Sequence, residues 1–120
     1  MNQTLQRKAL EFLYVGRCTV IERQNVKDPI TQITKQEEVP VLENQPCRLS
    51  FDRIASTNQT DTVGIVAQST KLFIAPELDI KAGSKIVVTQ RGRTTEYTRS
   101  GEPAIYSSHQ EIQLELFERW

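Results

Sequence analysis

The sequence predicts an all-β protein, a small β-barrel of about seven short, mostly antiparallel strands with a short N-terminal helix. Apolar and polar residues alternate with a period of two in most segments after residue 14, as in strands that bury one face. Turn-forming residues separate these segments at even spacing, which is typical of a small barrel or sandwich. The 120 residues suffice for one core and not for two ordinary domains, so we expect a single domain over 1–120.

The first segment alone has a helical period. We expect an amphipathic helix over 4–13, with Thr4 as its N-cap, and the β-barrel over 14–118. Gly16 marks the break between the two. The apolar residues that carry the helical period are Leu5, Ala9, Leu10, Phe12 and Leu13.

The strands are predicted from alternation and from the breaks between them. A Lys-Asp-Pro turn falls within 24–30, a second break at 43–46, and a tight reversal at Gly92. Pro40 cannot donate to a ladder, so its strand belongs at a sheet edge. The last segment places Ile112, Leu114 and Leu116 inside and Glu111, Gln113 and Glu115 outside. The expected strands lie at 14–23, 30–42, 47–51, 85–90, 94–99, 104–108 and in this last segment, with two further apolar runs around 68–70.

A long polar loop is expected near 53–62. The stretch from 52 to 62 has no period and is rich in Ser, Thr, Asn and Asp. Long loops in compact domains are usually functional or mobile. We therefore expect this loop to be mobile in the isolated subunit and to become ordered on assembly.

Cys18 and Cys47 fall on apolar faces of two predicted strands. Two cysteines and a single histidine cannot supply the four ligands of a structural zinc site. We expect two reduced, buried thiols on neighbouring strands, with a disulfide as the alternative. No metal or other cofactor is expected.

His109 is the only histidine, and it lies near Ser108 and Glu111. On a strand, Ser108 and His109 would point to opposite faces and could not contact each other. His109 and Glu111 would share a face, but a general base also needs a nucleophile and an oxyanion site. We expect a structural histidine at the start of the last strand, and a protein that is not an enzyme.

Charge is balanced overall, with fifteen basic and fifteen acidic residues, but it is uneven along the chain. The segment 81–99 is basic, and Lys85, Arg91 and Arg93 are candidate contacts to another subunit or to DNA. A solvated hairpin, a contact with the acidic face of a neighbouring copy and a contact with phosphates all remain open. The acidic residues of the two complementary segments are Glu37, Glu38 and Glu43, and Glu111, Glu115 and Glu118.

Three motifs, in this order and spacing, resemble the head–tail connector family of tailed phages, including connector proteins of PBSX-type defective prophages. The likeness covers about residues 10 to 118. The first motif, Cys47-Arg48-Leu49-Ser50-Phe51, precedes the polar loop, and the second is the turn Gly83-Ser84-Lys85-Ile86. The third is Tyr106-Ser107-Ser108-His109-Gln110-Glu111.

The resemblance implies a structural virion protein that is assembled in the host bacterial cytoplasm and joins the head to the tail. Its partners would be identical subunits in a ring, portal or adaptor and tail-completion proteins, and double-stranded DNA passing through without sequence specificity. In some relatives a long loop closes the DNA channel. The corresponding candidates here are Arg53, Ser56, Thr57, Asn58, Gln59, Thr60 and Asp61.

The alternative function is an OB-like nucleic-acid-binding barrel. It needs several exposed aromatics on one sheet face, whereas the Phe and Tyr residues here fall mostly on apolar-face positions. A small barrel enzyme such as a deoxynucleotide hydrolase lacks acidic metal ligands at usable spacing. No apolar run approaches the roughly 20 residues that span a bilayer, so no membrane partner is expected.

Overall fold

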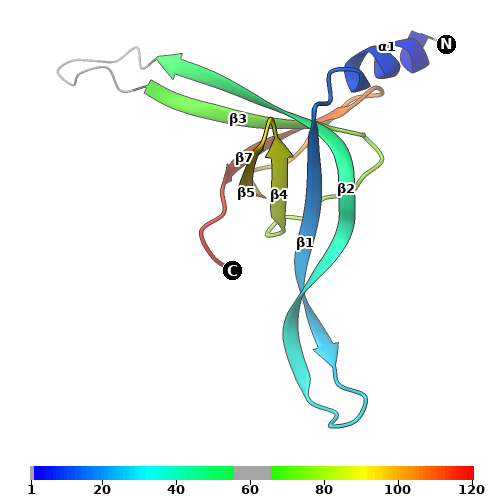
Figure 1. Ribbon diagram of the computed structural model, residues 1–120, viewed down its shortest axis with the longest axis vertical. Helices are drawn as coiled ribbons and strands as arrows, with labels where there is room; N and C mark the ends of the chain where they lie inside the picture. Colours follow the sequence, from blue (N-terminus) through cyan, green and yellow to red (C-terminus); the bar gives the residue numbers. More distant parts are fainter. Residues whose placement is uncertain (1, 56–65) are drawn as a thin grey trace.

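The computed structural model describes residues 2–55 and 66–120 and confirms the all-β class with one N-terminal helix (Figure 1). The helix is shifted from the predicted 4–13, so Thr4 lies within it and is not its N-cap. No helix of the described chain is long and apolar enough to span a membrane. The elements are α1 (Asn2–Glu11), β1 (Gly16–Lys27), β2 (Thr34–Ala55), β3 (Val66–Ile74), β4 (Lys85–Gln90), β5 (Arg93–Arg99), β6 (Ala104–Ile105) and β7 (Gln110–Leu116).

The strands form one antiparallel sheet that closes on itself. The order is β3-β2-β1-β4-β5-β7-β6, and β3 also pairs with β7. This last pairing, from Thr70 opposite Leu114 to Ile74 opposite Gln110, joins the two sides of the sheet into a ring. Over residues 16–21 β1 pairs with both β2 and β4, and over residues 70–74 β3 pairs with both β2 and β7.

The core fills this ring. Alternate residues of each strand point inward, so Cys18 and Val20 of β1 meet Ile86 and Val88 of β4. The prediction for β7 holds for Ile112 and Leu114 and is wrong for Leu116, whose side chain is 65% exposed at the strand's last residue. The remaining buried apolar residues are Cys47, Leu49, Leu72, Ile74, Ile80 and Tyr97.

β2 is a single strand of 22 residues, where the sequence predicted two strands separated by a break at 43–46. The expected break is a local irregularity: Asn44 has a φ of 51°, and the register with β1 shifts between Cys18 and Val20. Pairing resumes at once, with Gln45 opposite Cys18. A bulge of this kind bends a strand without ending it.

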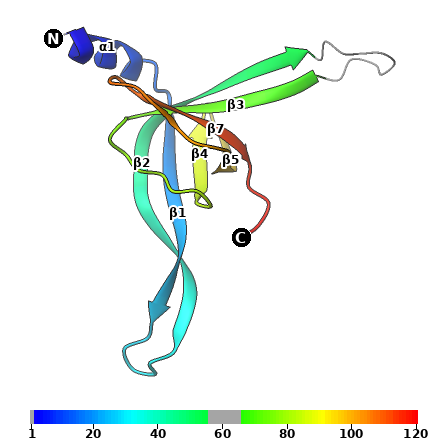
Figure 2. The same cartoon turned by 180° about the vertical axis from the view of Figure 1, so that it is seen from behind.

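Continuous β2 builds two projecting ribbons (Figures 1 and 2). Its first part pairs with β1 as far as Lys27, so the predicted turn at 24–30 begins only at residue 28. Its last part pairs with β3. Pro40 pairs with Ile21 and has no strand on its other side, which confirms the edge position. The radius of gyration is 17.5 Å, against about 14 Å for a compact chain of this length.

The predicted loop near 53–62 is shorter at its start, because 52–55 belong to β2. Arg53 is therefore a strand residue and not a loop residue. Its partner across the pair is Gln68 of β3. The other candidate loop residues, from Ser56 to Asp61, lie outside the described part of the chain.

Candidate functional site

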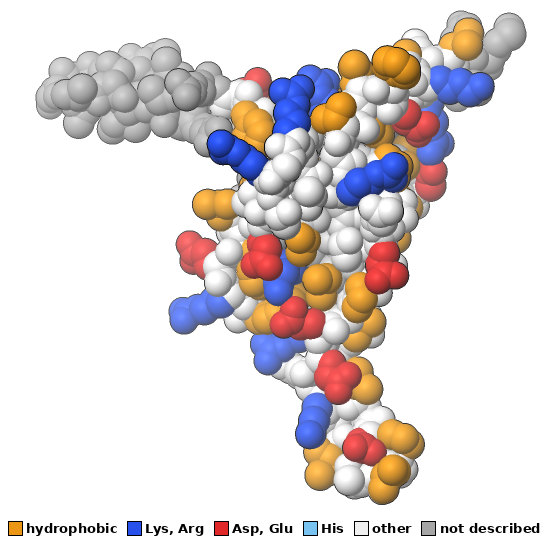
Figure 3. Space-filling view, viewed as in Figure 1, with side chains coloured by type: hydrophobic (Ala, Val, Ile, Leu, Met, Phe, Trp, Pro, Cys, Tyr) orange, Lys and Arg blue, Asp and Glu red, His pale blue; other side chains and the backbone are white. Residues whose placement is uncertain are grey.

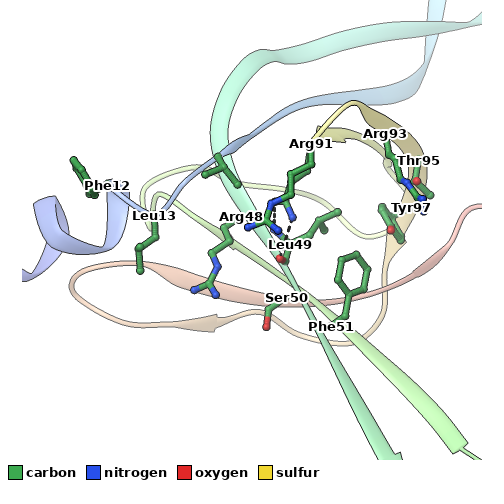
Figure 4. Close-up of a pocket in the computed structure, with 12 residues that line it drawn as sticks. Phe12, Leu13, Arg48, Leu49, Ser50, Phe51, Arg91, Arg93, Thr95 and Tyr97 are labelled. Carbon is green, nitrogen blue, oxygen red and sulfur yellow. Dashed lines mark hydrogen bonds between the residues drawn. The ribbon is translucent and has the colours of Figure 1, made fainter.

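A groove of about 730 Å³ lies where the end of α1, the middle of β2 and the tip of the β4–β5 hairpin meet (Figure 4). The groove combines an apolar floor with three guanidinium groups. Its apolar residues include Phe12, Leu13, Val15 and Phe51, and its cations are Arg48, Arg91 and Arg93.

The hairpin tip brings two of these arginines to the groove. Arg91 and Gly92 have φ values of 52° and 78°, the pair of positive angles that a type I′ turn requires. Arg93 pairs directly with Gln90, so the reversal is as tight as predicted. Arg91 thus lies in the two-residue turn, and Arg93 is the first residue of β5. The hairpin therefore presents them on a short, regular support.

Gln90 fixes this hairpin against β2. Its side-chain oxygen accepts a hydrogen bond from the N–H of Leu49 at 2.8 Å, and its amide nitrogen lies 3.4 Å from the Leu49 carbonyl oxygen. The contact crosses over Gly16, which pairs with Gln90 on one side and Cys47 on the other. A Cβ at Gly16 would lie 3.1 Å from the Gln90 oxygen and 3.2 Å from the Cys47 carbonyl oxygen. Glycine thus permits the bridge.

The groove exposes more apolar surface than the sequence indicated. The predicted face of Cys47, Leu49 and Phe51 is buried at its first two members, but Phe51 is 50% exposed. Phe12 is 87% exposed, since the helix ends just before it. The expectation that aromatics fall on buried positions is therefore wrong at these two residues. Contiguous exposed apolar surface with a polar rim is typical of an interaction site.

The three arginines give the groove a positive potential. Within the described chain none of them forms an ion pair. The Arg48 guanidinium carbon lies 5.9 Å from the centroid of the Phe73 ring, a cation–π contact. Arg48 was singled out by sequence only as a motif residue, and nothing in the local pattern places it beside the hairpin.

Lys85 is separated from this group. It stands at the opposite end of β4 from Arg91 and donates to the Glu38 carboxylate at 2.9 Å. Its ammonium also lies 5.1 Å from the Phe117 ring centroid and 5.4 Å from that of Trp120. The hydrogen bond from Lys85 holds the pKa of Glu38 below its usual range. Lys85 thus ties the C-terminal segment to the β1–β2 ribbon.

His109 lies in a second cluster, away from the groove. Its ring stacks between Phe73 and Tyr106, with centroid distances of 5.5 Å and 5.0 Å. Ser108 Oγ lies 3.0 Å from His109 Nδ1, and Glu111 Oε2 lies 2.9 Å from Nε2. The expectation that Ser108 and His109 cannot meet is wrong, because β7 begins only at Gln110 and strand alternation does not apply before it.

This cluster holds the imidazole on every side. Both ring nitrogens have hydrogen-bond partners and both ring faces stack on aromatic side chains, so the imidazole is held in one orientation. Lys71 adds a cation 3.7 Å from the Glu111 carboxylate. The Tyr106, His109 and Glu111 motif residues thus fasten the short β6–β7 pair to β3 by stacking and hydrogen bonds.

Cys18 and Cys47 are free, buried thiols on the neighbouring strands β1 and β2, as predicted. A hydrogen bond with Cys18 and burial both raise the pKa of the Cys47 thiol. The protonated thiol is unreactive. Cys47 accordingly serves the core beneath the groove.

The chain is similar in structure to the phage-like element PBSX protein xkdH from Bacillus subtilis. The TM-score is 0.50 at 14% sequence identity, over 83% of this chain and 91% of that protein. No protein-family model matches the sequence, and no curated protein sequence matches it significantly. At this identity the similarity shows a shared fold.

Proposed function

We propose that this protein is a structural component of a phage or prophage virion that joins the head to the tail. The observation that carries the proposal is the shared fold with a protein of a phage-like element, over most of both chains. The order and spacing of the three sequence motifs support the same assignment. The protein would act through contacts with other proteins and with DNA, and not as an enzyme.

The shape of the molecule suits such a role. Two ribbons project from a small ring of strands (Figure 1). The body carries an exposed groove where the end of α1, β2 and the β4–β5 hairpin meet. An isolated monomer gains little stability from surfaces of this kind, because exposed apolar side chains and two-stranded ribbons are stabilised only when a partner packs against them. Assembly into a ring with portal or adaptor and tail-completion proteins would supply those partners.

In this proposal double-stranded DNA passes through the assembled ring without sequence specificity. Arg53 lies near the outer end of the described part of the β2–β3 ribbon and is one candidate for contact with the channel. Arg91 and Arg93 are the others. Phosphate contacts would weaken steeply with salt, whereas contacts with a protein neighbour would follow the identity of the opposing carboxylates.

The test is removal of the coding sequence from the phage that carries it, followed by electron microscopy of the lysate. We expect DNA-emptied heads and separate, complete tails, with joining restored by the gene supplied in trans. Normal virions would refute the connector function. Heads that retain their DNA but lack tails would restrict the role to joining.

The exposed Phe51 and Phe12 beside three arginines favour one second candidate, the OB-like nucleic-acid-binding barrel. Single-stranded DNA bound to such a site would stack on the rings. Fluorescence anisotropy with labelled single-stranded and double-stranded oligonucleotides separates the two functions. Tight, salt-sensitive binding of single strands that is lost in Phe51→Ala would favour this candidate over the connector.

A further inference from the structure

The β1–β2 ribbon, residues 21–42, ends in an apolar tip whose side chains are exposed in the described part of the chain. This ribbon is called the arm below. Ile30 is 89% exposed and Ile33 55%, and Val26 lies beside them in β1. Figure 3 shows apolar side chains gathered at the far end of this ribbon. Loops of soluble monomers are usually polar at their tips, so we expect this apolar surface to bind a partner.

The tip is also well defined. The Asp28 carboxylate accepts hydrogen bonds from the N–H groups of Ile30 and Thr31, which hold the turn and keep the pKa of Asp28 below its usual range. The backbone of Gln32 donates to the Asp28 carbonyl as well. The apolar side chains are therefore presented on an ordered turn beside a carboxylate, at a small entropic cost on binding.

We infer that the arm of one copy docks its apolar tip into the arginine-lined groove of a second copy. The groove offers the matching chemistry: an apolar floor with Phe51, Phe12 and Leu13, edged by Arg48, Arg91 and Arg93. Asp28 would face these cations as Ile30 enters. At the tip Lys27 and Lys35 flank Asp28, and the other three carboxylates of the arm lie further from the turn, so the apolar side chains anchor the contact and the Asp28 carboxylate alone supplies the charge match.

A molecule cannot fill its own groove in this way. The groove lies at the Gly16 end of β1, where Gln90 pairs, and the arm's turn follows the other end at Lys27. The 12 residues of β1 separate the two by about 35–40 Å at roughly 3.3 Å per residue. The contact must therefore join different copies, and it uses two different surfaces. Such head-to-tail contacts generate closed rings or open filaments and not symmetric dimers.

The inference names the partner of the groove and so rests in part on the proposed function. It is tested first by cross-linking at about 1 mM protein, which populates a contact with a dissociation constant in the millimolar range. Chains carrying Ile30→Cys are mixed with chains carrying Phe51→Cys and oxidised. We expect a cross-linked dimer, and none when Ile105→Cys, a more exposed site outside the groove, replaces Phe51→Cys. The native thiols are buried and serve as the background in wild type.

Complementary surface variants then test the head-to-tail geometry. Ile30→Asp damages the arm, and Arg91→Glu with Arg93→Glu damages the groove; each is expected to abolish self-association by sedimentation velocity. Circular dichroism should show that both variants are folded, since all three side chains are exposed. A mixture of the two retains one intact arm facing one intact groove, so it should form heterodimers and nothing larger. The control pair is Ile105→Asp and Lys81→Glu with Arg119→Glu, which should behave as wild type.

Three outcomes would overturn the inference. The first is the absence of a specific cross-link, and the second is failure of the mixture to form heterodimers. The third is a groove variant that loses DNA binding while its self-association is unchanged, because DNA phosphate would then be the occupant of the groove. The two proposals can fail separately. Head–tail joining that survives Ile30→Asp removes the arm–groove contact alone, whereas a clear cross-link in a protein whose deletion leaves virions intact removes the connector function alone.

Discussion

Replacement of Gln90 by alanine tests whether its bridge to β2 holds the groove together. The Gln90 side chain makes a hydrogen bond of 2.8 Å to the Leu49 N–H and a longer contact of 3.4 Å to the Leu49 carbonyl oxygen. In Gln90→Ala the N–H of Leu49 loses its partner in a partly buried position. An unsatisfied group of this kind costs about 1–3 kcal/mol, and the longer contact adds little. We expect the free energy of unfolding to fall by about 2 kcal/mol.

That change is measurable by urea unfolding followed by tryptophan fluorescence and circular dichroism. With an unfolding entropy of about 2.1 cal/mol/K per residue, a loss of about 2 kcal/mol lowers Tm by roughly 8 °C. Gln24→Ala is the matched control, because within the described residues the Gln24 amide hydrogen-bonds to the exposed Glu22 side chain and to no buried group. It should change stability by less than about 0.5 kcal/mol.

A second variant separates the hydrogen bond from side-chain packing. Gln90→Glu keeps an oxygen that can accept from the Leu49 N–H but removes the amide donor. It should lose less stability than Gln90→Ala at neutral pH. If Gln90→Ala is as stable as Gln24→Ala, the bridge does not hold the hairpin, and the placement of Arg91 beside Arg48 has another cause.

Three further predictions follow from the same contacts. Gly16→Ala should lower the free energy of unfolding by about 1–3 kcal/mol, measured by urea unfolding, because the added Cβ would lie 3.2 Å and 3.3 Å from two backbone oxygens. An unchanged midpoint would show that the strands separate freely there. Native Cys18 and Cys47 should react slowly with a thiol reagent and completely after denaturation without reductant; fewer than two thiols then would mean a disulfide. Burial raises the pKa of Tyr14 to about 12, so its contribution to stability is present below the unfolded pKa of about 10 and is lost as the pH rises toward 12. The difference in alkaline absorbance between wild type and Tyr14→Phe should show this late ionisation, and a transition near the ordinary tyrosine pKa would contradict it.

Local features followed from the sequence because they depend on neighbours along the chain. The β4 strand Lys85–Gln90 and the reversal at Gly92 were predicted as observed, since alternation and a glycine with positive φ are properties of a few consecutive residues. The inward positions of Ile112 and Leu114 follow from the same period. The two buried thiols were likewise placed on the correct faces.

Errors arose where a local signal was overridden by pairing. The break predicted at 43–46 contains turn-forming residues, yet β1 and β3 supply hydrogen-bonding partners on either side of it, and one bulge at Asn44 absorbs the irregularity. Ser108 was placed on a strand and lies just before one, so its contact with His109 was missed. Strand alternation does not hold outside a strand, so a misplaced strand boundary changes which side chains can meet.

By itself, the sequence determined the strand class, the tight hairpin that carries Arg91 and Arg93, and the apolar faces that form the core. Only the tertiary structure decided that these two arginines meet Arg48 and Phe51 in one groove, and that the arm's apolar tip is exposed. The physical reason is the range of the forces involved. Periodicity reflects the geometry of each strand alone, whereas the groove depends on closure of the ring and on the Gln90 bridge across Gly16, which join residues more than 30 positions apart.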